Sequence, residues 1–199
     1  MQVRKTKIGL FVFLALTILS ITAFAEIKPE KLTIEKMMKA DPHRLYLTDL
    51  NLNNVIDGRI HVLDGNNYKY LGLISTGMFG VNALSRDSSK MFVATTYYTK
   101  RNRGDRFDQF EVYRTDDLNL ELEIEIPAKH AQALPYKATI TSSFDDKFVF
   151  IQNATPASSV SVINMNSKKF SAEISTPGCW IILPSRSKTN QFSTLCGDG

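Results

Sequence analysis

From Arg44 onward, short apolar stretches alternate with polar turns. Residues 59–64 carry apolar side chains at every second position and end at the turn signal Asp64-Gly65, which is the pattern of a half-buried β-strand. A polar turn and a second strand follow it. The same pair of strands occurs three times at a spacing of 50 residues, and the first strands of the pairs are 59–64, 109–114 and 159–164.

A further pair of strands, joined by a turn that contains aspartate, precedes the second and third copies. These strands are predicted at 81–85 and 91–97, and at 138–142 and 148–153. Four short strands that repeat about every 50 residues are typical of the blades of a β-propeller. A β-sandwich has similar strands and turns but no reason to repeat at this period.

The predicted fold class is therefore an all-β propeller that is incomplete. The first blade supplies three strands, the second and third supply four each, and the fourth stops after about two, at 180–183 and 191–196. A propeller must close into a ring, usually of four to eight blades. About three and a half blades at 44–199 indicate a ring that is truncated at its C-terminal side, with roughly as many residues missing as are present.

The first 25 residues have the features of a signal peptide. Arg4, Lys5 and Lys7 precede an uncharged apolar run at 8–21, and a small-residue motif ends at Ala25. We expect cleavage between Ala25 and Glu26 and export to the periplasm. The alternative, a membrane anchor, needs about 20 apolar residues, so we expect no membrane attachment after cleavage.

Residues 26–43 form an N-terminal arm in this interpretation. The spacing of apolar residues at 31–39 predicts a short helix, and Pro42 ends it. The alternative is a linker without regular structure.

The net charge and the cysteine and histidine positions bear on nucleic-acid binding, disulfide formation and metal binding. The formal net charge is +4, but three of these charges lie in the signal peptide, which leaves about +1 (+4 minus 3) and implies no nucleic-acid partner. Cys179 and Cys196 predict one disulfide in an oxidising compartment, worth about 3 kcal/mol for so short a loop. The alternative is two separate buried thiols. No histidine or cysteine spacing predicts a metal site.

Several short sequence stretches, taken in order along the chain, resemble the heavy subunit of amine dehydrogenases. The resemblance is nearer to the aromatic amine type than to the methylamine type. The resemblance runs from about Arg44 to Gly199. The stretches that carry it are 44–49, 57–64, 70–74, 95–97, 103–106, 111–113, 152–157, 178–180 and 192–199.

This resemblance implies a periplasmic oxidoreductase of two heavy and two light subunits. The heavy subunit of the family is a seven-bladed propeller that holds the light subunit and walls the substrate channel. The light subunit carries the tryptophan tryptophylquinone cofactor and the catalytic aspartate. The enzyme oxidises a primary amine to an aldehyde and ammonia, and its electrons pass to a blue-copper protein.

The residues fit this division of labour. Trp180 is the one tryptophan of the chain, so the chain cannot build a quinone that needs two. We expect no catalytic residue, no bound cofactor and no metal in this chain, because no nucleophile–base pair or ligand cluster stands out. The acidic residues are expected at turns and exposed strand positions.

Two residues are candidates for the channel wall. The family's loop at 77–80 places an aromatic side chain in the substrate channel, and here Met78 takes that position with Phe79 after it. The alternative is a loop residue packed inward.

Other residues have plainer interpretations. The basic run 100–103, with Arg106, is either a docking contact or, as we favour, a solvated connector. Asn153 begins a glycosylation-like motif but is expected to turn the chain before Pro156. Trp180 is expected to pack in the core beside the disulfide. His130 is expected to lie at the surface, and the alternative is that it lines a pocket.

Two other functional hypotheses remain open at this point. One is a periplasmic propeller without a cofactor that binds a ligand or a protein. The other is a truncated remnant without function, whose unpaired strand edges make it poorly soluble.

Overall fold

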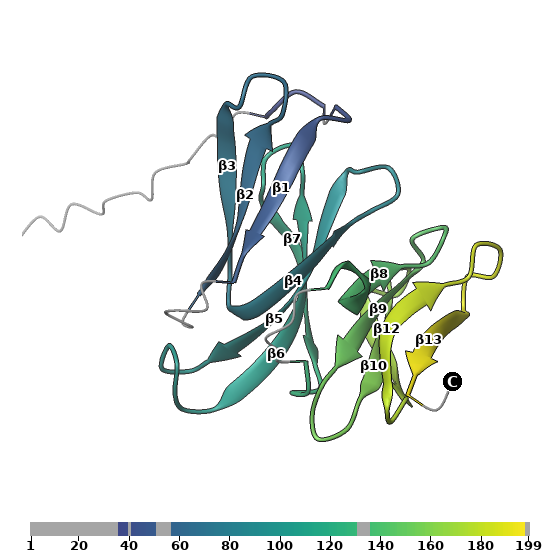
Figure 1. The fold of residues 1–199 in the computed structure, drawn as a ribbon. Helices are drawn as coiled ribbons and strands as arrows, with labels where there is room; N and C mark the ends of the chain where they lie inside the picture. Colours follow the sequence, from purple (N-terminus) through teal and green to yellow (C-terminus); the bar gives the residue numbers. More distant parts are fainter. Residues whose placement is uncertain (1–35, 40, 51–56, 131–135, 198–199) are drawn as a thin grey trace, which may run out of the picture. The chain divides into compact units, whose positions relative to one another are not determined.

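The computed structural model describes residues 36–39, 41–50, 57–130 and 136–197, and their strands form four antiparallel sheets. We call these sheets blades 1 to 4 in chain order; Figure 1 colours them from blue through teal and green to yellow. Blade 1 contains β1 (Arg44–Asp49), β2 (Gly58–Asp64) and β3 (Tyr70–Thr76). Blade 2 contains β4 (Met78–Leu84), β5 (Lys90–Tyr98), β6 (Arg106–Arg114) and β7 (Leu120–Ile126).

Blade 3 begins after a short 3-10 helix, η2 (Lys137–Thr139). Its strands are β8 (Ile140–Ser142), β9 (Phe148–Asn153), β10 (Ser159–Asn164) and β11 (Lys169–Ser175). Blade 4 contains β12 (Cys179–Pro184) and β13 (Phe192–Cys196).

The blades have three, four, four and two strands, so the all-β fold and the incomplete set of blades are confirmed. Within the described residues, no helix is long and apolar enough to cross a membrane. The signal peptide at 1–25 and its cleavage site, Ala25 and Glu26, lie outside the described residues. So does most of the predicted helix at 31–39, whose last described residues, 36–39, have no regular secondary structure.

The 50-residue repeat places equivalent strands at equivalent positions in each blade. β2, β6 and β10 carry Val62, Val112 and Val162, and all three valines are buried. Strand order within blades 2 and 3 follows the chain, so that β4 and β8 are the first strands of their sheets. β4 contacts β8, and β8 contacts β12, which is how the inner strands of a propeller lie around its axis.

Apolar side chains fill the spaces between successive blades. Each of the three core clusters draws its buried residues from two neighbouring blades. Ile60 and Val93 belong to the cluster between blades 1 and 2, whereas Phe110 and Ile151 belong to the cluster between blades 2 and 3. The fold is held together blade by blade, as expected for a repeat architecture.

Asparagine and aspartate end the strands by capping the turns. Asp64, Asp117 and Asn164 each accept a hydrogen bond from the backbone amide two residues later, at 2.8, 3.0 and 3.0 Å. Asp64 and Asn164 hold the same position in their turns, whereas Asp117 lies three residues later, where blade 1 has Asn67, which accepts from the Lys69 amide at 2.9 Å. Each of the three turns therefore contains an Asx turn.

Candidate functional site

The segment expected to line the substrate channel forms a β-bulge at the start of β4. Met78 pairs with Thr96 and Val81 pairs with Ala94, so Phe79 and Gly80 together lie opposite Thr95. Phe79 has a φ of 54°, a left-handed conformation that is uncommon for a residue with a side chain. Bulges of this kind redirect a side chain and occur often beside binding sites.

Both glycines of this segment are required by close neighbours. A Cβ atom on Gly77 would collide with the carbonyl oxygen of Thr96 and lie 2.8 Å from the ring of Tyr97. A Cβ atom on Gly80 would lie 2.5 Å from Oγ1 of Thr76. The two glycines therefore let Met78 and Phe79 sit against β3 and β5, and both side chains are half-buried.

Two side chains hold the backbone of the bulge. The Thr95 hydroxyl donates to the carbonyl oxygen of Met78 at 3.3 Å. Nε2 of His130 lies 3.2 Å from the carbonyl oxygen of Phe79, and Nδ1 of the same ring lies 3.4 Å from the carbonyl oxygen of Gln152 in blade 3. His130 is fully buried, so its predicted place at the surface is wrong. The reason is that its ring and its backbone amide all find polar partners inside the fold.

Asp108 is the centre of a second part of this network. Its carboxylate accepts hydrogen bonds from the Arg106 guanidinium at 2.6 and 2.9 Å, from Thr96 Oγ1 at 2.8 Å, and from the His130 amide at 2.7 Å. The carboxylate is fully buried, and these four bonds make that possible. The hydrogen bond to Asp108 raises the pKa of Arg106.

Glu111 forms a separate buried cluster on the opposite face of β6. Its carboxylate accepts hydrogen bonds from Tyr97 at 2.7 Å and Tyr113 at 2.9 Å. Burial raises the pKa of Glu111, and burial together with this carboxylate raises the pKa values of both tyrosines. The prediction that the acidic residues lie at turns and exposed positions is therefore wrong for Asp108 and Glu111, whose neighbours satisfy the buried oxygens.

Blade 4 repeats the bulge of blade 2. Trp180 pairs with Leu195 and Leu183 pairs with Ser193, Ile181 has a φ of 59°, and Thr194 donates to the carbonyl oxygen of Trp180 at 3.1 Å. Trp180 is thus the structural counterpart of Met78, and it is half-buried rather than enclosed in the core.

A disulfide joins the two strands of blade 4 beside this bulge. Cys179 and Cys196 are cross-strand partners and are bonded to each other. The described part of the chain contains no free cysteine, and in it no three histidine, cysteine, aspartate or glutamate side chains gather as metal ligands would.

The basic run and Asn153 were the two other candidates in the sequence. The run 100–103 is exposed, but Arg106 turns away from it to pair with Asp108. Asn153 is fully buried and donates to the hydroxyls of Ser159 and Ser161, both at 2.9 Å. Its amide nitrogen is therefore inaccessible to a glycosylating enzyme.

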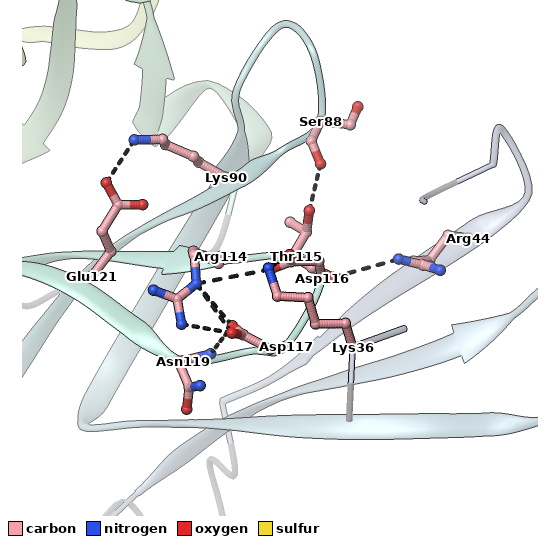
Figure 2. A network of polar contacts seen from close by, with 10 residues as sticks. All are labelled: Lys36, Arg44, Ser88, Lys90, Arg114, Thr115, Asp116, Asp117, Asn119 and Glu121. Atoms are coloured by element: carbon pink, nitrogen blue, oxygen red, sulfur yellow. Dashed lines mark hydrogen bonds and ion pairs between the residues drawn. The ribbon is translucent and has the colours of Figure 1, made fainter. Parts of the chain in front are cut away.

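A polar network joins the N-terminal segment to the turn between β6 and β7 (Figure 2). Lys36 pairs with Asp116 at 2.8 Å, and Arg44 donates to the carbonyl oxygen of Thr115 at 3.4 Å. Arg114 donates to Asp117 and lowers the pKa of that carboxyl to about 2. An open hollow of about 430 Å³ lies beside this network. The charges of Lys36, Arg114 and Asp116 are partly exposed, whereas Asp117 is nearly buried, and these charges already pair with one another. The network therefore ties blade 1 to blade 2 and leaves few charged groups free to bind a ligand.

Comparison with known proteins decides the family. Residues 41–199 match the family model described as methylamine dehydrogenase heavy chain (MADH). The chain belongs to this family. The amine dehydrogenase resemblance is thereby confirmed, whereas the nearer likeness to the aromatic amine type stays a prediction.

Two relatives within the family carry the same description. The methylamine dehydrogenase heavy chain of Methylophilus methylotrophus is 26% identical over 203 residues, with 96% of this chain and 49% of the relative covered. That of Methylobacillus flagellatus is 26% identical over 170 residues, with 85% and 42% covered. The chain spans less than half the length of these two relatives.

A solved structure supports the propeller fold. The dihydro-heme d1 dehydrogenase NirN in complex with DHE superimposes with a TM-score of 0.54 at 14% identity, over 82% of this chain and 32% of that one. The likeness concerns the fold alone.

Sequence reasoning singled out 77–80 but interpreted it as a loop, whereas β4 already begins at Met78. The strand starts earlier than predicted because a bulge lets residues 78–80 pair with β5 despite the two glycines, which are a signal for such a bulge. His130 follows a lysine in the connection after β7, where nothing in the sequence predicts burial. Its role depends on partners 51 and 22 residues away, in Phe79 and Gln152.

Proposed function

We propose that the chain is the N-terminal part of the heavy subunit of a periplasmic, quinone-dependent amine dehydrogenase. The observation that carries the proposal is the family match, which extends over nearly all of the sequence after the arm. In this role the chain is a scaffold and a substrate-channel wall, and a separate light subunit performs the oxidation of a primary amine to an aldehyde and ammonia.

The β4 bulge supports a role in the channel wall. β4 is the first strand of its blade, and the first strands of propeller blades surround the central channel. Met78 and Phe79 are only half-buried in the chain by itself, so part of each apolar side chain is free to contact another molecule. A hydrophobic amine would gain favourable contacts from such a wall.

In this proposal the light subunit, and not this chain, carries out the oxidation of the amine. Building tryptophan tryptophylquinone takes two tryptophans, and the chain has one, Trp180, whose carbonyl is bonded to Thr194 in the blade 4 bulge. The quinone on the light subunit would accept electrons from the amine and pass them to a blue-copper protein. The chain's own residues would bind and orient the light subunit, in an assembly of two heavy and two light subunits, and exclude water from the channel.

A periplasmic location fits two features. The first 25 residues have the pattern of a cleaved leader, and a disulfide such as Cys179–Cys196 is typical of an oxidising compartment.

The first test is the DNA sequence beyond the codon for Gly199 and in the neighbouring genes. We expect it to continue into about three more blades, the number that completes a seven-bladed ring, next to a light-subunit gene. A stop codon with no such blades or partner nearby would limit the resemblance to ancestry and leave a ligand-binding propeller or a remnant as the alternatives.

The second test is biochemical. The chain and its continuation, co-expressed with the light subunit, should co-purify with it and reduce a dye only when an amine is added. Met78→Ala should change KM for a bulky amine more than for a small one, whereas the matched control Met165→Ala in blade 3 should not. Failure of the light subunit to co-purify would contradict the scaffold role.

A further inference from the structure

A buried histidine clamps the backbone of the β4 bulge. His130 lies in the connection between blades 2 and 3, and none of its surface is exposed. Its two ring nitrogens face two backbone carbonyl oxygens from different blades, that of Phe79 at 3.2 Å and that of Gln152 at 3.4 Å. The ring therefore lies between the inner strand of blade 2 and β9 of blade 3.

The ring is fixed in place from its own backbone. The His130 amide donates to Oδ2 of Asp108 at 2.7 Å, and that carboxylate is held in turn by Arg106 and Thr96. Contacts with β6 and β5 thus fix the position of His130 independently of its contact with β4. A side chain anchored in this way can impose a conformation on its partner.

Phe79, the residue that His130 contacts, has an unfavourable backbone conformation. Phe79 has a φ of 54°, which costs a residue with a side chain about 1 to 2 kcal/mol. A conformation of this kind persists when surrounding contacts hold it. The carbonyl of Phe79 receives such a contact from His130, and that of Met78 receives one from Thr95.

We propose that His130 is a positioning residue that fixes the left-handed backbone of Phe79 and with it the direction of the Met78 and Phe79 side chains. Nε2 carries the proton in this arrangement and donates to the carbonyl oxygen of Phe79. We call this hydrogen bond the clamp. Selection of amines by size would follow from the clamp, and this consequence rests on the proposed function, whereas the clamp does not depend on that function.

Two substitutions separate the ring's two contacts. His130→Gln places an amide nitrogen near the position of Nε2 and keeps a donor for Phe79, whereas His130→Asn places it near Nδ1, facing the Gln152 carbonyl, and leaves Phe79 without a donor. Hydrogen–deuterium exchange with mass spectrometry compares the variants in the full chain. Exchange in β4 should be roughly three- to tenfold faster in His130→Asn than in His130→Gln, the effect of losing one hydrogen bond. Exchange in β13, which pairs only with β12 among the described strands, serves as the internal control.

A measurement on the unsubstituted chain covers the case in which a variant fails to fold. The chain has three histidines, so ¹⁵N spectra of ring-labelled protein resolve them readily. A proton on Nε2 of His130, alone or with a second on Nδ1, supports the clamp. A proton on Nδ1 alone would overturn it, because Nε2 could not then donate to Phe79.

The outcomes distinguish the clamp from the proposed function. Equal exchange of β4 in the two variants overturns the clamp. Different exchange, together with a changed ratio of kcat/KM between a bulky and a small amine in the assembled enzyme, supports both. Different exchange with an unchanged ratio supports the clamp and counts against the channel role of Met78 and Phe79.

Discussion

The hydroxyl of Thr95 donates a hydrogen bond of 3.3 Å to the carbonyl oxygen of Met78, directly across the bulge that bends β4. Thr194 makes the equivalent bond to Trp180 in blade 4, at 3.1 Å. A bulge held by a threonine hydroxyl therefore occurs in the inner strand of two blades, although the residue at the bulge is a methionine in one blade and a tryptophan in the other.

Replacing Thr95 by valine tests this device. Thr95→Val keeps the shape of the side chain but removes its hydroxyl, and the free energy of unfolding should fall by about 1 kcal/mol. Thr95→Ser keeps the hydroxyl and is the control. Urea denaturation measures both, and equal stability of the valine variant and the wild type would mean that the bond contributes nothing.

Gly77 is expected to tolerate no side chain. Gly77→Ala would place a methyl group against the carbonyl oxygen of Thr96, so the backbone must shift, at a cost of roughly 1 to 3 kcal/mol. Gly197→Ala is the matched control, because its new Cβ atom meets nothing nearer than 3.9 Å. Thermal unfolding of the two variants checks the difference. Similar melting temperatures would show that β4 and β5 can separate freely at this point.

Glu111 should make stability depend on pH. Burial raises its pKa in the folded chain, so the folded state holds the proton more tightly than the unfolded state. Its contribution to stability is therefore full below the ordinary glutamate pKa and is lost as the pH rises through the raised value. Glu111→Gln does not titrate. As the pH rises through the raised pKa, the free energy of unfolding of this variant should increase relative to that of the wild type by roughly 1.4 kcal/mol for each unit by which the pKa is raised.

Urea denaturation of both proteins from about pH 4 to about pH 8 measures this difference and cancels the other titrating groups. Glu123→Gln is the control. Glu123 lies opposite Glu111 on β7 and its charge helps to raise the pKa of Glu111, so its removal should flatten the pH dependence only in part. A difference between wild type and Glu111→Gln that stays constant with pH would contradict the raised pKa.

Blade 4 should make the chain associate when it is expressed alone. Leu195 and Leu183 are 60% and 45% exposed, and the outer edge of β13 has no neighbouring strand within the described residues. Open edges and apolar patches promote association. Leu195→Lys should raise the monomer fraction in light scattering, and Ser187→Lys, which adds the same charge at an exposed site, should not. A monomeric wild type with one sharp melting transition would refute this expectation.

Local patterns in the sequence predict the blades but not the contacts between distant residues. Val62, Val112 and Val162 reveal the repeat because burial on one face of a strand imposes a period of two, and the turn residues mark each strand end. Asp108, Glu111 and His130 look like surface residues because each is polar and no partner for it can be read from the neighbouring sequence. Their burial depends on Thr96, Tyr97 and Phe79, which only the folded sheets bring to them.

The division of the core among pairs of neighbouring blades isolates one part of the molecule from another. Disruption at one end should fade within a blade or two, because no single core spans all four sheets. The bulge at Met78 and Phe79 takes its support from Thr95, His130 and blade 3. The bulge should therefore keep its native form when blade 4 changes, and substitutions in blade 4 could accumulate over evolution while the inner surface of blade 2 stayed intact.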